Sequence, residues 1–146
     1  MRLPLVFALL LSCATSAFAQ LAAAGEAGIA MGHVHLNVRD VQVQKQLWID
    51  HFGAMPLRKD GVDGVKLPGM LILFDGKDSK GGSEGTVLDH IGFEVRDLQA
   101  LCRKLEARGI KFDVPYRTLP GRGLAIAFLT DPYGVSIELT AGMATW

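Results

Sequence analysis

The chain has 146 residues, enough for one domain with a hydrophobic core, and 49% of them are hydrophobic. Its 15 basic and 15 acidic residues balance to a formal net charge of zero. This balance excludes the strongly basic surface with which proteins bind nucleic acids or anionic membranes, so we expect neither as a partner.

Residues 1–19 have the pattern of a secretory signal peptide. Arg2 supplies a positive charge, the apolar stretch after it is too short to span a bilayer, and Ala17-Phe18-Ala19 is a small-x-small cleavage site. We therefore expect a secreted or periplasmic protein whose mature chain begins at Gln20. The alternatives are a buried N-terminal helix and a lipid anchor on Cys13, which follows a loosely lipobox-like sequence.

The first half of the mature chain predicts a linker, a strand, a helix and three further strands. Residues 33–39 alternate apolar and polar side chains, as a half-buried strand does. Asp40 is a typical N-cap for the helix that follows, and Gly53 is a typical stop signal. The expected elements are a linker over 20–30, a strand over 33–39, a helix over 41–52 and strands over 55–58, 65–67 and 70–74.

A polar stretch rich in glycine, serine and lysine, residues 76–86, separates this unit from a second one of the same order. The second unit predicts a strand over 88–96, a helix over 97–108 and strands over 111–115, 124–130 and 135–140. The folded domain therefore spans 31–142, with modules over 31–75 and 87–140.

The two helices carry the larger buried side chains. In the first helix we expect Leu47, Trp48 and Phe52 to be buried and His51 to face solvent. In the second, the helical pattern around Cys102 favours a small buried apolar residue over a nucleophile. After cleavage this is the only cysteine left, so a disulfide within the mature chain is excluded.

An internal repeat defines the fold. Residues 32–41 and 89–98 each contain a histidine five positions before the valine of a Val-Arg-Asp sequence, and each changes from a strand period to a helix period. Two βαβββ units of this kind predict an α+β fold. We expect their sheets to curl into one open, barrel-like surface around a central metal site, with the helices on the outside.

Residue parity places unusual side chains on the concave side of this surface. The first strand contributes His33 and His35, the second unit contributes His90, and the last strand contributes Glu138. Two imidazoles and a carboxylate that converge would bind one Fe, Mn, Zn or Ni ion and leave positions open for substrate. A glutamate within an apolar strand supports this interpretation, because a buried unpaired carboxylate is costly. Each residue taken alone could equally be a satisfied core or rim residue.

The strand over 124–130 is expected to complete the concave wall. If the bulky Leu124, Ile126 and Phe128 face the helices, Ala125 and Ala127 line the concavity. These small side chains would leave room there for a ligand. A turn-rich loop is expected just before this strand, over 118–123.

Two segments carry a family resemblance, His90–Val95 and Leu129–Leu139, the second of which contains Asp131-Pro132-Tyr133-Gly134. On these residues the chain resembles the vicinal oxygen chelate superfamily of glyoxalase I, extradiol dioxygenases, and fosfomycin- and bleomycin-resistance proteins. The resemblance covers about residues 31–140. It implies paired modules around one divalent metal ion and a small-molecule substrate, with modules paired in one chain or exchanged in a homodimer.

The resemblance implies that the metal ligands are His33, His90 and Glu138. The first ligand falls on His33, not His35, because His33 shares the five-residue offset of His90. Glyoxalase I has a fourth ligand, usually glutamate, on the last strand of its first module. That place falls on Leu73, which cannot bind a metal, so the set is closer to those of extradiol dioxygenases and fosfomycin-resistance enzymes.

The predicted function is that of an exported, metal-dependent enzyme: a lyase, isomerase or dioxygenase of the glyoxalase and dioxygenase type. Glu138 and His35 are the candidate catalytic residues, and His35 would be a substrate-facing base. Export disfavours reactions that consume glutathione, which belongs to the reducing cytosol. The alternatives are a metal-free protein that sequesters a small molecule and a structural domain without activity.

Overall fold

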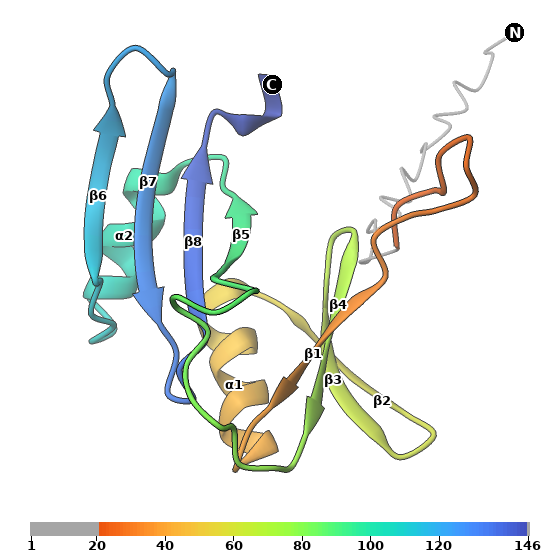
Figure 1. Cartoon of the computed structure of the whole chain (residues 1–146). Helices are drawn as coiled ribbons and strands as arrows, with labels where there is room; N and C mark the ends of the chain where they lie inside the picture. The colour runs from red at the N-terminus through yellow and green to blue at the C-terminus, as the bar shows by residue number, and fades with distance from the viewer. Residues whose placement is uncertain (1–20, 146) are drawn as a thin grey trace, which may run out of the picture.

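The computed structural model of the chain, shown in Figure 1, describes residues 21–145 as two modules with the same element order. The expected signal peptide lies outside the described residues. Module 1 consists of β1 (His33–Asn37), α1 (Val41–Phe52), β2 (Met55–Lys59), β3 (Val62–Leu67) and β4 (Met70–Asp75). Module 2 consists of β5 (Ile91–Glu94), α2 (Leu98–Glu106), β6 (Val114–Leu119), β7 (Leu124–Thr130) and β8 (Ser136–Ala141), followed by the short 3-10 helix η1 (Met143–Thr145).

Each module forms one four-stranded sheet, in the order β1-β4-β3-β2 or β5-β8-β7-β6. The first strand of each module pairs in parallel with the last, and the other pairs are antiparallel. This arrangement confirms the α+β fold of two βαβββ modules. The two sheets are separate and form no closed barrel, and Figure 1 shows α1 lying between them. In each sheet the first strand, β1 or β5, is an edge strand.

Aspartates cap both helices, as the sequence predicts. The carboxylate of Asp40 accepts hydrogen bonds from the backbone N–H groups of Gln42 and Val43. Asp97 accepts one from Ala100. These bonds satisfy N–H groups that have no partner within the first turn of a helix. At the other end of α1, Gly53 adopts the left-handed conformation, with φ of 67°.

The helix-facing sides of the strands form the core, as predicted from parity. Leu36 and Val38 of the first repeat and Ile137 and Leu139 of β8 are all buried. Helix α1 differs from expectation in the burial of several side chains. Trp48 is fully buried, but the second fully buried side chain of this helix is Gln44, and Leu47 and Phe52 are only half-buried. His51 is also half-buried rather than solvent-facing.

Gln44 is buried because it connects the modules. Its side-chain Nε2 donates to Asp131 Oδ2 in the turn before β8, at 2.5 Å. Asp131 Oδ1 also accepts from the backbone N–H groups of Tyr133 and Val135. The Tyr133 hydroxyl in turn bonds to both the backbone N–H and the carbonyl of Asp40. These contacts fix the N-terminal end of α1 against the turn of module 2.

The connection between the modules is attached to the same turn. Ser83 donates from its backbone N–H to the Gly134 carbonyl, and its hydroxyl bonds to Ser136 N–H and to the Asp89 carbonyl. Gly82 lies so close that a Cβ there would be 2.9 Å from the Gly134 carbonyl oxygen. The second half of the polar stretch over 76–86 is therefore held in place by specific contacts.

The predicted orientation of β7 is wrong. Register with β8 pairs Phe128 with Glu138 and Ile126 with Thr140, so the bulky residues lie on the same face of the sheet as Glu138. Ala125 and Ala127 are buried in the core on the helix side. The small residues allow close packing of β7 against α2 and the rest of the core, a requirement that side-chain volume along one strand does not reveal.

Two element boundaries also differ from expectation. Strand β6 runs to Leu119, so the start of the expected loop over 118–123 belongs to the strand. A bulge between Val114 and Arg117 contains Pro115, whose missing N–H is tolerated at such an irregularity. Strand β5 is shorter than expected and begins at Ile91. Within residues 21–145, neither helix has the length and apolar character needed to cross a membrane.

Candidate metal centre

The structure brings together two of the three predicted metal ligands. His90 immediately precedes β5, and Glu138 lies in β8, which pairs with β5. His90 Nε2 and Glu138 Oε2 are 3.1 Å apart, with side chains 36% and 19% exposed. Two donors bound at about 2.1 Å to one ion, at right angles, would be about 3.0 Å apart. The observed spacing therefore fits two adjacent positions on one divalent ion.

Asp89 orients the imidazole of His90. Its Oδ1 lies 2.8 Å from His90 Nδ1, and its Oδ2 accepts the backbone N–H of Gly85. The hydrogen bond with His90, followed by that from Gly85, holds the pKa of the Asp89 carboxyl below its usual value. In the tautomer that carries the proton on Nδ1, where Asp89 can accept it, the lone pair of Nε2 is available to a metal ion between His90 and Glu138. A carboxylate behind the imidazole is the usual second partner of a metal-bound histidine.

The third predicted ligand is not part of this cluster in a single chain. His33 lies at the start of β1, in the other module, and its side chain is exposed. Among residues 21–145, no three histidine, cysteine, aspartate or glutamate side chains are close enough together to hold a metal ion. One chain therefore presents two half-sites: His33 on module 1, and His90 with Glu138 on module 2.

His35, the predicted base, lies on the same face of β1 as His33. Their rings are 6.3 Å apart, edge to face. His35 Nε2 is 3.3 Å from Asp75 Oδ1, and this carboxylate also pairs with Lys77. The hydrogen bond from Lys77 is the largest cause of the lowered pKa of Asp75. A charged carboxylate thus lies next to His35 and can orient its ring.

The strand register confirms the equivalence of the two modules. His35 pairs with Leu73 across β1 and β4, and Gly92 pairs with Glu138 across β5 and β8. His33 lies two residues before His35, and His90 lies two residues before Gly92. Leu73 therefore occupies in module 1 the place that Glu138 occupies in module 2, and module 1 offers no carboxylate there.

Sequence reasoning missed two neighbours of the site. Asp89, directly before His90, is absent from the predicted site, although an acidic residue next to a ligand histidine is a readable signal. Phe128 was assigned to the wrong face, yet its ring lies 5.4 Å from that of His90 in an edge-to-face contact. It provides an apolar wall beside the imidazole.

Comparison with known proteins supports a family assignment. Residues 30–139 match the Glyoxalase/Bleomycin resistance protein/Dioxygenase superfamily. A comparison with curated proteins found no match.

Solved structures of low sequence identity share the fold. The genomically encoded fosfomycin resistance protein FosX from Listeria monocytogenes aligns with a TM-score of 0.65 and 19% identity, over 77% of this chain and 93% of that one. A superfamily member from Sphaerobacter thermophilus gives 0.63 and 18%, over 78% and 98%. The lactoylglutathione lyase from Agrobacterium tumefaciens gives 0.59 and 20%, over 77% and 93%. The chain belongs to the glyoxalase/bleomycin resistance protein/dioxygenase superfamily.

Proposed function

We propose that the protein is an exported enzyme of this superfamily that depends on one divalent metal ion and acts on a small oxygen-bearing substrate. The observation that carries this proposal is the pair of His90 and Glu138, 3.1 Å apart, with Asp89 behind the imidazole. Fe, Mn, Zn or Ni would suit this donor set. When bound, the ion would supply Lewis acidity to a substrate coordinated through two neighbouring oxygens.

The third ligand in this proposal is His33 of a second copy of the chain. The contacts of Gln44 and Tyr133 fix α1 against the turn of module 2, and within residues 21–145 His33 forms no three-residue ligand cluster with His90 and Glu138. A two-fold axis that brings module 1 of each copy to module 2 of the other would create two equivalent sites.

Exposed features at the start of both edge strands support this pairing. Met31 precedes β1 and is 51% exposed, and Leu88 precedes β5 and is 59% exposed. Exposed large apolar side chains commonly become buried in a contact with another protein. Burying them between copies would bring the edges of β1 and β5 together, where the half-sites lie.

His35 is the proposed general base. It lies beside His33 on the same face of β1, and its Nε2 is 3.3 Å from Asp75 Oδ1. This partner would stabilise the imidazolium formed when His35 accepts a proton from the substrate. Glu138 would have two roles, as a metal ligand and as a group that contacts the bound substrate. A lyase, isomerase or dioxygenase reaction could use this arrangement.

The test is metal complementation between two inactive variants. Purified His33→Ala and His90→Ala/Glu138→Ala proteins are each expected to hold almost no metal. After unfolding and refolding together in equal amounts, half of the dimers are mixed, and each mixed dimer has one intact site of two. The mixture should regain about one quarter of the wild-type metal content. Wild-type protein refolded in the same way is the control.

Other outcomes would change the proposal in specific ways. Undiminished metal in His33→Ala would remove this residue from the ligand set. If mixed dimers form but no metal binding is recovered, a site shared between two copies is rejected. A wild type without metal, which binds a small molecule equally well in excess chelator, would favour sequestration over catalysis. Export would be tested in the same preparation by fractionation and by the mass of the mature chain, expected to begin at Gln20.

A further inference from the structure

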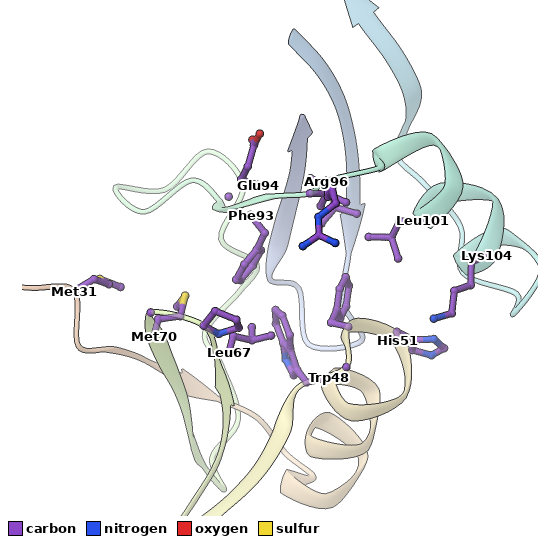
Figure 2. A pocket seen from close by; sticks show the side chains of 17 residues that line it. Met31, Trp48, His51, Leu67, Met70, Phe93, Glu94, Arg96, Leu101 and Lys104 are labelled. Carbon is purple, nitrogen blue, oxygen red and sulfur yellow. The ribbon is translucent and has the colours of Figure 1, made fainter. Parts of the chain in front are cut away.

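A cavity lies at the junction of the two modules. Its volume is about 670 Å³, within the range of pockets that hold small organic ligands. Its walls come from the C-terminal half of α1, the β3–β4 turn, strand β5 and helix α2. Figure 2 shows it between these elements. His33, His90 and Glu138 do not line it.

The floor of the cavity is aromatic and rigid. Trp48 is completely buried, and its ring lies 4.9 Å from Phe52 and 5.5 Å from Phe93. Leu139, also fully buried, and Leu101 complete the apolar lining. Phe52, Phe93 and Leu101 are half-buried, so these side chains present the apolar surface of the cavity, and Trp48 supports the two phenylalanine rings from beneath. This surface suits an aromatic or short aliphatic ligand body.

The opening of the cavity is positively charged. Arg96 and Lys104 lie at its rim, where Figure 2 shows the Arg96 guanidinium directed toward the aromatic floor and the Lys104 amine directed toward His51. Neither cation forms an ion pair with a residue of the described chain, 21–145. Two cations without an acidic partner beside an apolar surface favour an anionic ligand.

The one acidic residue in the lining does not neutralise this charge. The Glu94 carboxylate accepts hydrogen bonds from the backbone of Gly142 and Met143 and from the hydroxyl of Thr140. Although burial raises its pKa, these bonds outweigh that effect and lower it. Figure 2 shows Glu94 pointing away from the cationic rim. Its charge is therefore engaged by the C-terminal segment.

We propose that this cavity binds a small carboxylate with an aromatic or short aliphatic body. The body would lie against Phe52, Phe93 and Leu101, above the buried Trp48, and the carboxylate would bind Arg96 and Lys104. A guanidinium is well suited to a carboxylate because its N–H groups can donate two parallel hydrogen bonds. The site requires no metal and uses none of the proposed metal ligands.

The test uses 4-phenylbutyrate as the probe and 4-phenyl-1-butanol as its uncharged counterpart. A Trp146→Phe background leaves Trp48 as the only tryptophan, so fluorescence reports on the cavity floor. Titrations contain excess EDTA, which separates this site from the metal centre. Calorimetry gives the affinities. We expect the acid to bind more tightly than the alcohol and to change the Trp48 emission.

Replacing the two cations at the rim then tests whether they bind the carboxylate of the probe. Arg96→Gln/Lys104→Gln should weaken binding of the acid about tenfold and leave the alcohol within about twofold, because only the charged contacts are lost. The matched control is Arg103→Gln, an exposed cation on α2 that does not line the cavity. Leu101→Phe, which adds volume to the lining, should weaken both ligands. Circular dichroism and urea unfolding verify that each variant is folded.

Three results would overturn this proposal. The first is equal affinity for acid and alcohol. The second is an unchanged affinity for the acid in the Arg96→Gln/Lys104→Gln variant. The third is that neither probe binds, while the Leu101→Phe variant sediments as a monomer and the Trp146→Phe protein sediments as a dimer. That result would assign the cavity to the contact between copies instead.

Discussion

Removal of the Asp131 carboxylate should destabilise the whole molecule, because this group joins the two modules. Asp131 is 5% exposed and accepts hydrogen bonds from Gln44 Nε2 and from the backbone N–H groups of Tyr133 and Val135. Asp131→Ala leaves all three donors without their acceptor in a buried place. At about 1 kcal/mol or slightly more for each bond, the loss is about 3 to 4 kcal/mol.

Asp131→Asn should cost much less, about 1 kcal/mol, for a reason that the structure supplies. The asparagine oxygen can still accept from Tyr133 and Val135, but its NH2 group would face the NH2 group of Gln44. The Gln44 carbonyl oxygen is buried and has no hydrogen-bond partner in the described chain, 21–145. Rotation of the Gln44 amide by half a turn would present that oxygen to the new donor.

Urea unfolding followed by tryptophan fluorescence and circular dichroism measures both variants. In thermal unfolding, the melting temperature of Asp131→Ala should fall by about 12 to 16 °C, given about 4 °C for each kcal/mol in a domain of this size. Asp50→Ala, which removes an exposed acceptor of Gln46, is the matched control and should change little. Equal losses for Asp131→Asn and Asp131→Ala would refute the amide rotation. A loss below about 1 kcal/mol for Asp131→Ala would refute the role of the junction.

Two further predictions concern titratable groups. The hydrogen bond from Lys45 lowers the pKa of Asp63, although burial opposes this, and the two side chains are only 14% and 15% exposed. Because the folded pKa lies below the unfolded one, the stability from this pair is present above about pH 4 and is lost as the pH falls through the folded pKa. Asp63→Asn should therefore flatten the dependence of unfolding free energy on pH below about pH 4, measured by urea titration, and an unchanged slope would contradict this. Burial, followed by the charge of Glu106, raises the pKa of the Cys102 thiol. Labelling of Cys102 by DTNB at pH 8 should be at least about tenfold slower in the folded than in the urea-unfolded protein, and equal rates would show that the thiol is accessible.

The repeat was the most informative feature of the sequence. Its five-residue offset selected His33 and His90 as equivalent positions, and the strand register places them two residues before the pairs His35–Leu73 and Gly92–Glu138. Alternation along β1 and β8 also assigned the core face correctly. Such patterns are readable because both the repeat and the alternation are local properties of the chain.

The errors arose where distant segments decide the outcome. The faces of β7 depend on its register with β8, not on the sizes of Ala127 and Phe128. Gln44 is buried because Asp131, 87 residues away, meets it. For the same reason the sequence could not show that His33 lies apart from His90 in one chain. The relative placement of two modules depends on contacts that no periodicity encodes.

The attachment of the inter-module connection at Ser83 has a practical consequence for protein engineering. Because Gly82 and Ser83 are packed and hydrogen-bonded against the turn at Gly134, an insertion there would disturb the β8 end of module 2. The preceding exposed residues, 77–80, make only surface contacts, so they offer a permissive point for a protease recognition sequence or for new chain ends in a circular permutant.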